Sequence, residues 1–544
     1  MQAPARSFVL VLGLVSLSAR PSRAADVQAG PADYREKVAA LQPGDTLHLG
    51  AGTYTDLLSI SGKNGRADAW ITITGPESGA PAIFEADSGP CCNTIEIRSS
   101  SYIALEHLVV DGKNVAGAFG VNASNGPVHH ITIEGCNFLN HDNGQQTVAI
   151  STKVTTWSWI IRGNRIVGAG TGLYLGNSDG TQPFIGGLIE NNLVADTIGY
   201  NMEIKWQSGR SAQPGMPEQP VSTVIRNNVF MKNDRPSEDG DRPNVLVGGF
   251  PNSGLGAEDR YEFYGNFWFD NPRESLLQVS GRVSIHDNVF VKGGAAAINL
   301  SDHDLPLRLA HVYNNTIYAT ETGIAFSSSA PQGDAVIGNL VFSGNPISGS
   351  IQNQRDNVTD SVANAGSLVA SPSVTLGSMD FYPLAGKCEG GALGLSQFSA
   401  DTDYDKDFNG TNKGPFTFRG AYAGSGRNPG WKLAEDLKNG GGGATPAGGA
   451  GGGPGTGGTS GSGAVSSGGS AGASPGGAGG TGGTSSAGSG SGAASGASSA
   501  TAASDDGGCG CRVRARERSS ALLYAMALGL ALCLRARRRT HFFG

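Results

Sequence analysis

The sequence predicts an all-β solenoid, on the basis of a repeated motif, its spacing and the composition of the chain. Glycine supplies 85 of the 544 residues and charged side chains only 16%, with glycine and proline scattered along the chain. This composition disfavours a coiled coil or a helical bundle. Short apolar runs of alternating pattern lead repeatedly into an asparagine and a second apolar run. Such a recurrence is typical of short strands stacked in successive coils.

The repeat is marked by eight asparagines at intervals of 27, 28, 36, 38, 22, 27 and 24 residues: Asn137, Asn164, Asn192, Asn228, Asn266, Asn288, Asn315 and Asn339. The shorter intervals define the basic coil, and the longer ones predict loops inserted between neighbouring coils. Asparagine tolerates the left-handed backbone of a sharp bend, and its amide can form a hydrogen-bonded ladder along stacked coils. We therefore expect an asparagine ladder at one corner of the solenoid.

Outside the predicted folded domain, which covers residues 25–439, the chain carries a signal and a linker. Residues 1–24 combine Arg6, an apolar stretch at 8–17 and a small-x-small cleavage site, as in a secretory signal peptide. Residues 440–508 contain 29 glycines, and Val465 is their only large apolar side chain. Such a segment buries too little apolar surface to offset the entropy of ordering, so it predicts a flexible Gly/Ser/Ala-rich linker.

Residues 509–544 contain Cys509-Gly-Cys511, a short apolar helix at 521–534 and an arginine cluster at 535–539. The apolar run is shorter than the roughly 20 residues of most transmembrane helices, but the arginines fit a cytoplasmic stop. This arrangement resembles the myxobacterial C-terminal sorting tag. The resemblance implies export, processing near the cysteines and retention at the cell surface or outer envelope. An ordinary membrane-anchoring tail is the alternative.

Both ends of the folded domain extend the repeat. Residues 43–54 are typical of an opening coil, and residues 34–41 of a short amphipathic helix that covers the exposed strand edges. Near the other end stand Asp405-Lys-Asp-Phe-Asn-Gly410 and Arg419-Gly-Ala-Tyr422.

Together with the repeat, these segments resemble the right-handed parallel β-helix of the pectate-lyase-like superfamily. Members often end with Asp-Phe-Asp-Gly and Asp-Ile-Gly-Ala-Tyr-Glu, and this chain departs from those motifs at Asn409 and at Phe418-Arg419. The resemblance spans about residues 43–422. It implies a right-handed parallel β-helix solenoid but no particular reaction.

The folded domain is acidic. Without residues 1–24 and those after 439, the chain keeps 28 basic and 43 acidic side chains, a net charge near −15. This balance disfavours nucleic acid as a partner, and we expect none, because phosphate binding needs a basic face. An anionic polysaccharide fits only where bound cations or a local basic patch reverse the field.

Four of the seven cysteines fall in this domain: Cys91, Cys92, Cys136 and Cys388. In an exported protein they predict one or two structural disulfides, although the adjacent Cys91 and Cys92 are poorly placed to pair with each other. Their spacing matches no zinc site.

Four carboxylates alternate shortly before Gly410: Asp401, Asp403, Asp405 and Asp407. Calcium takes six or more oxygen ligands, so this alternation resembles a calcium loop, although an EF-hand would place glycine sixth and glutamate twelfth. The two interpretations are a structural Ca²⁺ site and a solvated acidic turn. The acidic turn, capping the helix, is the favoured interpretation, and Ca²⁺ is the only cofactor that the sequence suggests.

The strongest candidate site lies in residues 200–207. Read as a strand, this segment points Met202, Ile204 and Trp206 inward, and Glu203, Lys205 and Gln207 outward.

The coils that follow extend the same outward face. They add three polar side chains to it: Gln278, Asn299 and His303. Trp206 would stack on a sugar if it faced outward. Inserts at 208–222 and 232–242 flank the face, and such inserts build grooves suited to an extended saccharide.

A polysaccharide lyase needs a cation that neutralises the uronate and a base near the α-proton. Lys205 and Arg242 suit these roles, with His303 as acid or base. Glu203 and Lys205 also resemble the Glu-x-Lys region of calcium-dependent β-helix lyases, although the wider motif around the lysine is absent. The substrate-binding candidates are Trp206, Gln207, Gln278 and Asn299.

Two other classes of function stay open. A glycoside hydrolase or an epimerase on the same fold would pair Glu203 with Asp239 or Asp241 as two carboxylates. In a non-catalytic carbohydrate-binding or adhesion module, Glu203 and Lys205 would form an exposed ion pair of little energetic importance. We expect a surface-retained β-helix that engages polysaccharide, with lyase chemistry ahead of the other enzymatic reactions and the non-catalytic surface module as its rival.

Overall fold

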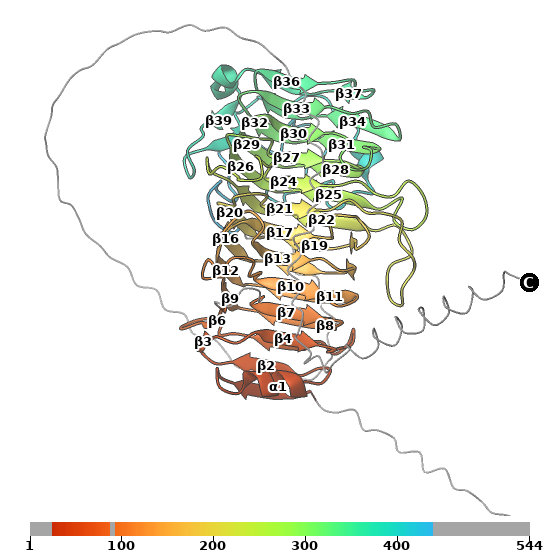
Figure 1. The fold of residues 1–544 in the computed structure, drawn as a ribbon. Coiled ribbons are helices and arrows are strands. Elements are labelled where there is room, and N and C mark those ends of the chain that lie inside the picture. Colours follow the sequence, from red (N-terminus) through yellow and green to blue (C-terminus); the bar gives the residue numbers. More distant parts are fainter. Residues whose placement is uncertain (1–23, 88–92, 439–544) are drawn as a thin grey trace, which may run out of the picture. The chain divides into compact units, whose positions relative to one another are not determined.

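The structure is a computed structural model and describes residues 24–87 and 93–438. Each coil contributes one strand to each of three parallel sheets, which we number 1, 2 and 3 in the order in which the chain visits them (Figure 1). As the chain rises in Figure 1, it passes from sheet 2 through sheet 3, which faces the viewer, to sheet 1. This direction makes the solenoid right-handed, and the predicted right-handed parallel β-helix is confirmed.

Sheet 1 contains the strands β1 (Asp26–Ala29), β2 (Thr46–Leu49), β5 (Ile71–Thr74), β8 (Ser101–Glu106), β11 (Val128–Glu134), β14 (Thr156–Trp157), β15 (Ile160–Arg162), β18 (Phe184–Ile185), β19 (Leu188–Glu190), β22 (Ser222–Arg226), β25 (Arg260–Tyr264), β28 (Arg282–His286), β31 (Leu309–Tyr313), β34 (Gly333–Ile337) and β37 (Gln354–Arg355). Sheet 2 contains β3 (Gly52–Tyr54), β6 (Ala82–Glu85), β9 (Leu108–Asp111), β12 (Asn137–His141), β16 (Arg165–Ala169), β20 (Leu193–Ala195), β23 (Val229–Met231), β26 (Phe267–Asn271), β29 (Val289–Gly293), β32 (Thr316–Tyr318), β35 (Leu340–Phe342) and β38 (Val358–Asp360).

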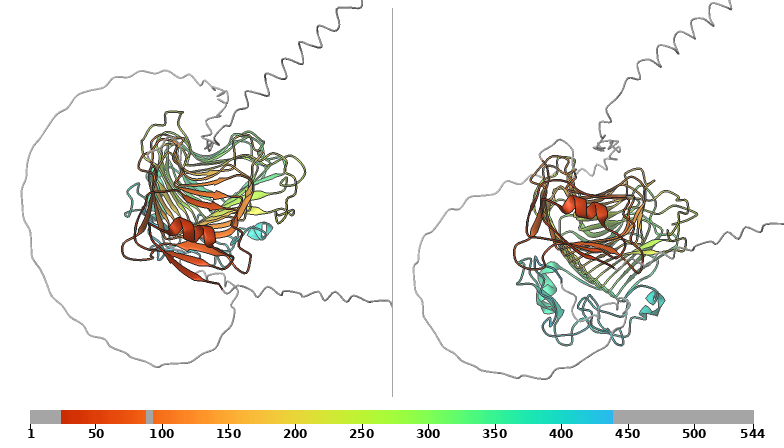
Figure 2. Two further views of the ribbon diagram at one scale, coloured as in Figure 1. Left: turned by 60° about the horizontal axis from the view of Figure 1, so that its bottom comes forward. Right: turned by 90° about the horizontal axis from the view of Figure 1, so that it is seen from below.

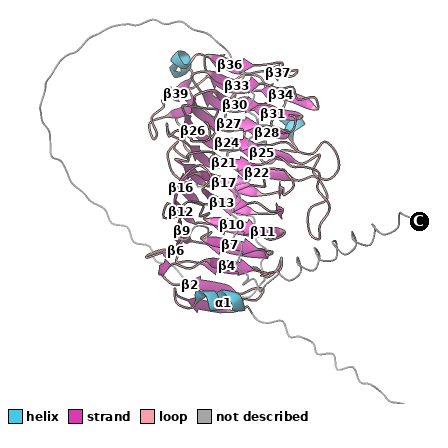
Figure 3. Ribbon diagram, in the orientation of Figure 1, coloured by secondary structure: helices cyan, strands magenta, loops and turns pink. Residues whose placement is uncertain are grey.

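Sheet 3 contains β4 (Leu58–Ser61), β7 (Ile95–Arg98), β10 (Val121–Ser124), β13 (Val148–Thr152), β17 (Thr171–Leu175), β21 (Met202–Ile204), β24 (Val245–Val247), β27 (Leu277–Val279), β30 (Ala296–Leu300), β33 (Thr322–Phe326) and β36 (Asn345–Ser348). The remaining elements are α1 (Tyr34–Ala40), η1 (Val362–Ser367), the antiparallel pair β39 (Val369–Ser371) and β40 (Asp380–Pro383), and η2 (Leu395–Phe398) (Figure 3).

The core lies between the three sheets. Alternate residues of the strands point into it. Met202 and Ile204 of β21, for example, are fully buried, and each stacks between the equivalent residues of the two neighbouring coils. Large rings stack in the same way, and the rings of Trp268 and Phe290 lie 5.3 Å apart and nearly parallel. Each coil therefore buries the apolar face that its neighbour would leave exposed.

An asparagine ladder runs along the corner between sheets 1 and 2. Asn192 is typical, since its Nδ2 donates to Asn228 Oδ1 at 2.9 Å and to the Ile161 carbonyl at 2.8 Å. The ladder contains Asn164, Asn192, Asn228, Asn266, Asn288, Asn315, Asn339 and Asn357. The predicted ladder is confirmed, with Asn357 as an addition.

Two details of that prediction are wrong. Asn137 begins β12, and Cys136 takes its place in the ladder, where the Cys136 N–H donates to Asn164 Oδ1 at 2.9 Å. The left-handed residue is also the one before each ladder asparagine, as at Asn191 (φ 55°) and Asp287 (φ 53°). Because that preceding residue makes the bend, the ladder residue is free to align its amide along the solenoid.

The helix α1 covers the first coil, as predicted for residues 34–41. Tyr34 and Val38 point into the core. The Tyr34 hydroxyl donates to the Asp56 carbonyl at 2.5 Å, and its ring meets the Tyr54 ring edge-on at 5.1 Å. The cap therefore shields the first strands with apolar contacts.

The segment after β38 turns back along the outside of the solenoid instead of adding coils to it (Figure 2). Its buried side chains, including Phe408 and Tyr422, form one apolar cluster with Phe267 and Val289, which point outward from sheet 2. The outer face of sheet 2 is therefore covered, whereas the site discussed below lies on sheet 3.

Several predicted features lie outside the described residues: the signal peptide, the linker, the sorting tag with its apolar helix, and the pair Cys91 and Cys92. Within residues 24–87 and 93–438, Cys136 and Cys388 are buried and form no disulfide. In the same part of the chain, none of the helices has the length and apolar character needed to cross a membrane.

Candidate functional site

The predicted site lies on the outer face of sheet 3. In β21, Met202 and Ile204 point into the core and Glu203 points outward, as strand alternation predicts. Parallel pairing aligns Glu203 with equivalent residues of neighbouring coils. In order along the solenoid, this outward row contains Tyr174, Glu203, Leu246, Gln278 and Asn299.

Glu203 and Lys205 form an ion pair on this face, with 2.8 Å between Lys205 Nζ and Glu203 Oε1. Only 4% of the Glu203 side chain and 19% of the Lys205 side chain are exposed, so the pair is far more buried than the sequence suggested. Burial lowers the pKa of Lys205, but the Glu203 carboxylate and the Tyr174 hydroxyl raise it more, and the net shift is upward. The site therefore presents a charged ammonium at neutral pH.

Arg242 reaches the same face from the loop before β24. Its guanidinium lies 5.8 Å from the centre of the Tyr200 ring. Its main-chain carbonyl accepts hydrogen bonds from Lys232 Nζ at 3.3 Å and Asn271 Nδ2 at 2.9 Å. Burial and the Glu203 carboxylate raise the pKa of Tyr200, whereas Arg242 lowers it. Tyr200 therefore links the guanidinium electrostatically to the Glu203–Lys205 pair.

His303 lies in the loop that follows β30. Its imidazole is 38% exposed, and its Nε2 lies 3.5 Å from the Asp304 carboxylate. Asp304 helps to raise the pKa of both Lys205 and Tyr200, which shows that this loop borders the same cluster. The loop thus brings a partly exposed imidazole to the edge of the site.

Trp206 and Gln207 follow the last paired residue of β21, where strand alternation no longer sets their direction. The Trp206 indole N–H donates to the Ser178 carbonyl at 3.1 Å, and the half-buried ring packs against Gly180. Gln207 is 1% exposed, and its Nε2 donates to the Phe184 carbonyl at 3.0 Å. The expected outward direction of Gln207 is therefore wrong, because its amide satisfies a buried main-chain group.

Gln278 and Asn299 stand in the Glu203 row, as predicted. Both are half-buried. Gln278 Nε2 donates to Ser301 Oγ at 3.4 Å, and Asn299 Oδ1 accepts from Ser327 Oγ at 2.8 Å. They continue the polar face toward the C-terminal coils.

The two inserts border sheet 3 at opposite edges, because residues 208–222 follow β21 and residues 232–242 precede β24. The first insert is held by a buried ion pair of 2.6 Å between Arg210 and Asp259. The second is held by Arg235, which lies 2.6 Å from Asp142. Both inserts are therefore fixed beside the site by contacts with neighbouring coils.

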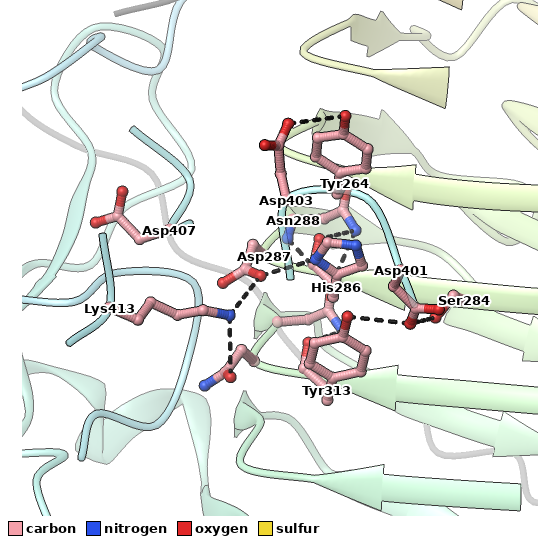
Figure 4. A network of polar contacts seen from close by, with 12 residues as sticks. Tyr264, Ser284, His286, Asp287, Asn288, Tyr313, Asp401, Asp403, Asp407 and Lys413 are labelled. Carbon is pink, nitrogen blue, oxygen red and sulfur yellow. Dashed lines mark hydrogen bonds and ion pairs between the residues drawn. The ribbon is translucent and has the colours of Figure 1, made fainter. Parts of the chain in front are cut away.

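The aspartates expected to bind calcium lie away from this face, and two of them, Asp401 and Asp403, contact residues of sheet 1 (Figure 4). Asp401 pairs with Arg260 at 2.7 Å and accepts from the Tyr313 hydroxyl at 3.1 Å. Asp403 instead accepts from the Tyr264 hydroxyl at 3.0 Å. These two carboxylates attach the C-terminal segment to sheet 1.

The other two aspartates have partners of their own. Asp405 accepts from Asn412 Nδ2 at 3.1 Å, and Asp407 accepts main-chain N–H groups, including that of Thr411 at 2.8 Å. Within residues 24–87 and 93–438, no group of three or more His, Cys, Asp or Glu could hold a metal ion. The four aspartates therefore do not form a common ligand set in the structure, because each carboxylate is hydrogen-bonded or ion-paired to different neighbouring groups.

Sequence reasoning missed the aromatic residues of the site and one further cation. Lys153 Nζ lies 5.4 Å from the centre of the Phe119 ring and 5.2 Å from that of Tyr174. Lys205 Nζ lies 5.3 Å from the same Tyr174 ring. Aligning Leu173-Tyr-Leu-Gly with Met202-Glu-Ile-Lys would have revealed Tyr174, since the two segments follow their ladder asparagines at similar distances.

No protein-family model matches the chain, and no curated protein matches it. Similar solved structures include an alginate lyase from Paenibacillus sp. str. FPU-7, with 15% identity and a TM-score of 0.42 over 60% of this chain and 99% of that one. Pectate lyase Pel9A has 14% identity and a TM-score of 0.42, over 73% and 96% of the two chains. A lacto-N-biosidase from Eubacterium ramulus has 12% identity and a TM-score of 0.38, over 62% and 68%. At this level of similarity, the fold assignment rests on the strand pairing itself and any function on the site.

Proposed function

We propose that this protein binds an acidic polysaccharide on the outer face of sheet 3 and cleaves it by β-elimination. The observation that supports this proposal most directly is a local concentration of positively charged side chains on a domain whose net charge is near −15. Lys153, Lys205 and Arg242 all stand over aromatic rings of this one face. They supply the local basic patch that a polyanion needs in order to approach an acidic protein.

β-Elimination from a uronate removes the proton α to the carboxylate, breaks the C–O bond to the leaving sugar and forms a C=C bond. Negative charge accumulates on the carboxylate in the transition state, and fixed cations stabilise it there. Lys205 and Arg242 suit this role because Glu203 keeps the pKa of Lys205 raised. We assign proton transfer to His303, the imidazole at the edge of the cluster.

The contacts of the other carboxylates disfavour a glycoside hydrolase. Glu203 is paired with Lys205, whereas Asp239 accepts from Gln146 Nε2 at 3.1 Å and Asp241 lies 3.9 Å from Arg273. A carbohydrate-binding module remains the second candidate, because an ammonium held in its charged state binds a carboxylate without any turnover.

Export and retention at the cell surface form part of the proposal. They are supported by the signal-peptide pattern of residues 1–24 and by the cysteines, apolar run and arginines of residues 509–544. The protein would then bind its polysaccharide outside the cytoplasm.

A panel of uronic-acid polymers tests the reaction, with the ultraviolet absorbance of the unsaturated product as readout. Each polymer is assayed with added calcium and with a chelator, which also tests the expected calcium dependence. Turnover of at least one polymer that Lys205→Met abolishes would support the proposal. Binding without turnover would support the module, and activity on neutral glycans alone would overturn both.

A further inference from the structure

We propose that the bound polysaccharide lies along the solenoid axis, with the carboxylates of alternate sugars held by Arg98, Lys153 and Lys205 on alternate coils of sheet 3. This inference rests on the proposed function and adds to it the direction, register and spacing of the bound chain.

The three cations belong to one register row. Arg98 of β7 pairs with Ser124 of β10. Lys153 comes directly after Thr152, the partner of Leu175, and Lys205 comes directly after Ile204, which also pairs with Leu175. In order along the solenoid, the row therefore reads Arg98, Ser124, Lys153, Gly176 and Lys205.

The row alternates long cations with small residues. Neighbouring strands lie about 4.8 Å apart, so cations on alternate coils are spaced by about 10 Å. Ser124 and Gly176 leave room between them, and no side chain at Gly176 separates Lys153 from Lys205. In a ribbon-like β-1,4-linked polymannuronate, alternate carboxylates point to one side of the chain at a similar spacing. The cation row therefore matches one edge of such a ribbon.

Aromatic rings hold the lysines of this row in place. Lys153 Nζ lies between the rings of Phe119 and Tyr174, and Tyr174 also contacts Lys205, with each ammonium 5.2–5.4 Å from a ring centre. A cation over a ring face gains electrostatic attraction without losing its charge. The lysines are thus held on the outer face and stay able to meet a carboxylate.

Two acidic residues of the face stand beside cations of the row. Glu96 stands two residues before Arg98 and Glu203 two residues before Lys205, and each forms an ion pair with the cation that follows it. The equivalent residue before Lys153 is Ser151. Position 151, unlike positions 96 and 203, therefore adds no carboxylate to the face.

Two polar atoms near the cation row lack hydrogen-bond partners. Asn122 Oδ1 and Ser151 Oγ, both in the outward row next to the cations, are buried and have no hydrogen-bond partner within the described part of the chain. Buried polar atoms without a partner are unfavourable, and a sugar hydroxyl that displaces the groups covering them would satisfy them.

Oligomannuronates of two and six residues test the inference, with dissociation constants measured by calorimetry on the folded domain. The wild type should bind the hexamer at least tenfold more tightly than the dimer. Lys153→Met should lose about tenfold in affinity for the hexamer, as expected for one charge-assisted contact, and keep its affinity for the dimer. Lys153→Arg should restore hexamer binding. Lys113→Met removes a lysine that pairs with Glu85 away from this face and should change neither constant.

A measurement without any variant supplements the series, since binding of the hexamer should weaken more steeply with added salt than binding of the dimer. Equal affinity of the wild type for the two oligomers, or unchanged hexamer binding in Lys153→Met, would overturn the cation row. Turnover of a uronate polymer without this length dependence would overturn the row and leave the lyase proposal standing. Length-dependent binding without turnover of any polymer would overturn the lyase proposal and leave the row standing.

Discussion

Lys205 Nζ lies 2.8 Å from Glu203 Oε1 on the outer face of sheet 3, and 96% of the Glu203 side chain is removed from solvent. A carboxylate buried to this extent is stable only while a cation or hydrogen-bond donors compensate its charge. The pair therefore links the stability of β21 to the charge that the site offers a ligand.

This relationship predicts different outcomes for one and for two substitutions. Lys205→Met should lower the free energy of unfolding by about 2–4 kcal/mol, because it leaves the Glu203 carboxylate buried without its partner. The double variant Glu203→Gln, Lys205→Met should regain most of that loss and still fail to bind uronates. Denaturant unfolding and uronate binding, measured on all three proteins, check both statements. Full stability of Lys205→Met would show that Glu203 is compensated by other groups.

The asparagine ladder predicts a contrast between two asparagines that look alike in the sequence. Asn228→Ala removes hydrogen bonds to Asn192, Asn266 and the Ile189 carbonyl, and should cost about 3 kcal/mol or more because buried polar groups lose their partners. Asn137→Ala is the matched control, since Asn137 lies one residue beyond the ladder, and its cost should be small. Thermal and denaturant unfolding compare the two variants. Equal losses would contradict the register described for Cys136.

The contacts of Asp401 predict that it stabilises the attachment of the C-terminal segment. Asp401→Asn weakens the contacts to Arg260 and Tyr313 and should lower the free energy of unfolding by about 1–3 kcal/mol. Asp405→Asn serves as control, because Asp405 is 36% exposed and lies 3.7 Å from Lys406, where a surface pair contributes little. The loss in Asp401→Asn should be the same with calcium and with a chelator. A calcium-dependent difference would restore the metal interpretation of this loop.

His141 predicts a loss of stability in mild acid. It is 0% exposed, and burial lowers its pKa from 6.5 to about 4. As the pH falls from about 6.5 to 4, the unfolded chain takes up a proton that the folded protein does not, so the free energy of unfolding falls, by up to roughly 3 kcal/mol from this group. Below pH 4 the histidine is protonated in both states, so it adds no further dependence on pH and the loss of stability stays at its full value.

Denaturant unfolding between pH 4 and pH 7 measures this slope. His141→Gln should flatten the slope whatever its effect at neutral pH, and part of the slope should persist because burial also lowers the pKa of His129 to about 4. Identical slopes for the wild type and His141→Gln would contradict the assignment.

The proposed display at the cell surface predicts the behaviour of a truncated chain. Deleting everything after Ser504 removes the cysteines, the apolar run and the arginines, and keeps the whole β-helix and most of the linker. The shortened protein should appear folded in the medium, whereas the full-length protein stays with the cells. Immunoblots of the cell and medium fractions check this outcome. Continued cell association would mean that the β-helix itself is what binds the envelope.

Much of the fold could be predicted because its signals are local and periodic. Alternation within β21 correctly assigned the directions of Met202, Glu203 and Ile204, since successive residues of a strand face opposite sides. The same reasoning failed at Gln207, which lies beyond the last paired residue. It also misplaced Asn137 by one residue, because a cysteine takes the ladder position in that coil.

The sequence by itself determined the coil period, the corner at which the asparagines stack and the outward direction of Glu203. Each of these depends on residues close together in the chain or on a repeat of nearly constant length. Only the tertiary structure decided that Arg242 and Tyr200 join the Glu203–Lys205 pair, and that Asp401 pairs with Arg260, 141 residues away. Such contacts depend on which coils stack and where each insert folds back. Because packing over the whole solenoid sets the positions of these residues, no local sequence pattern predicts the contacts between them.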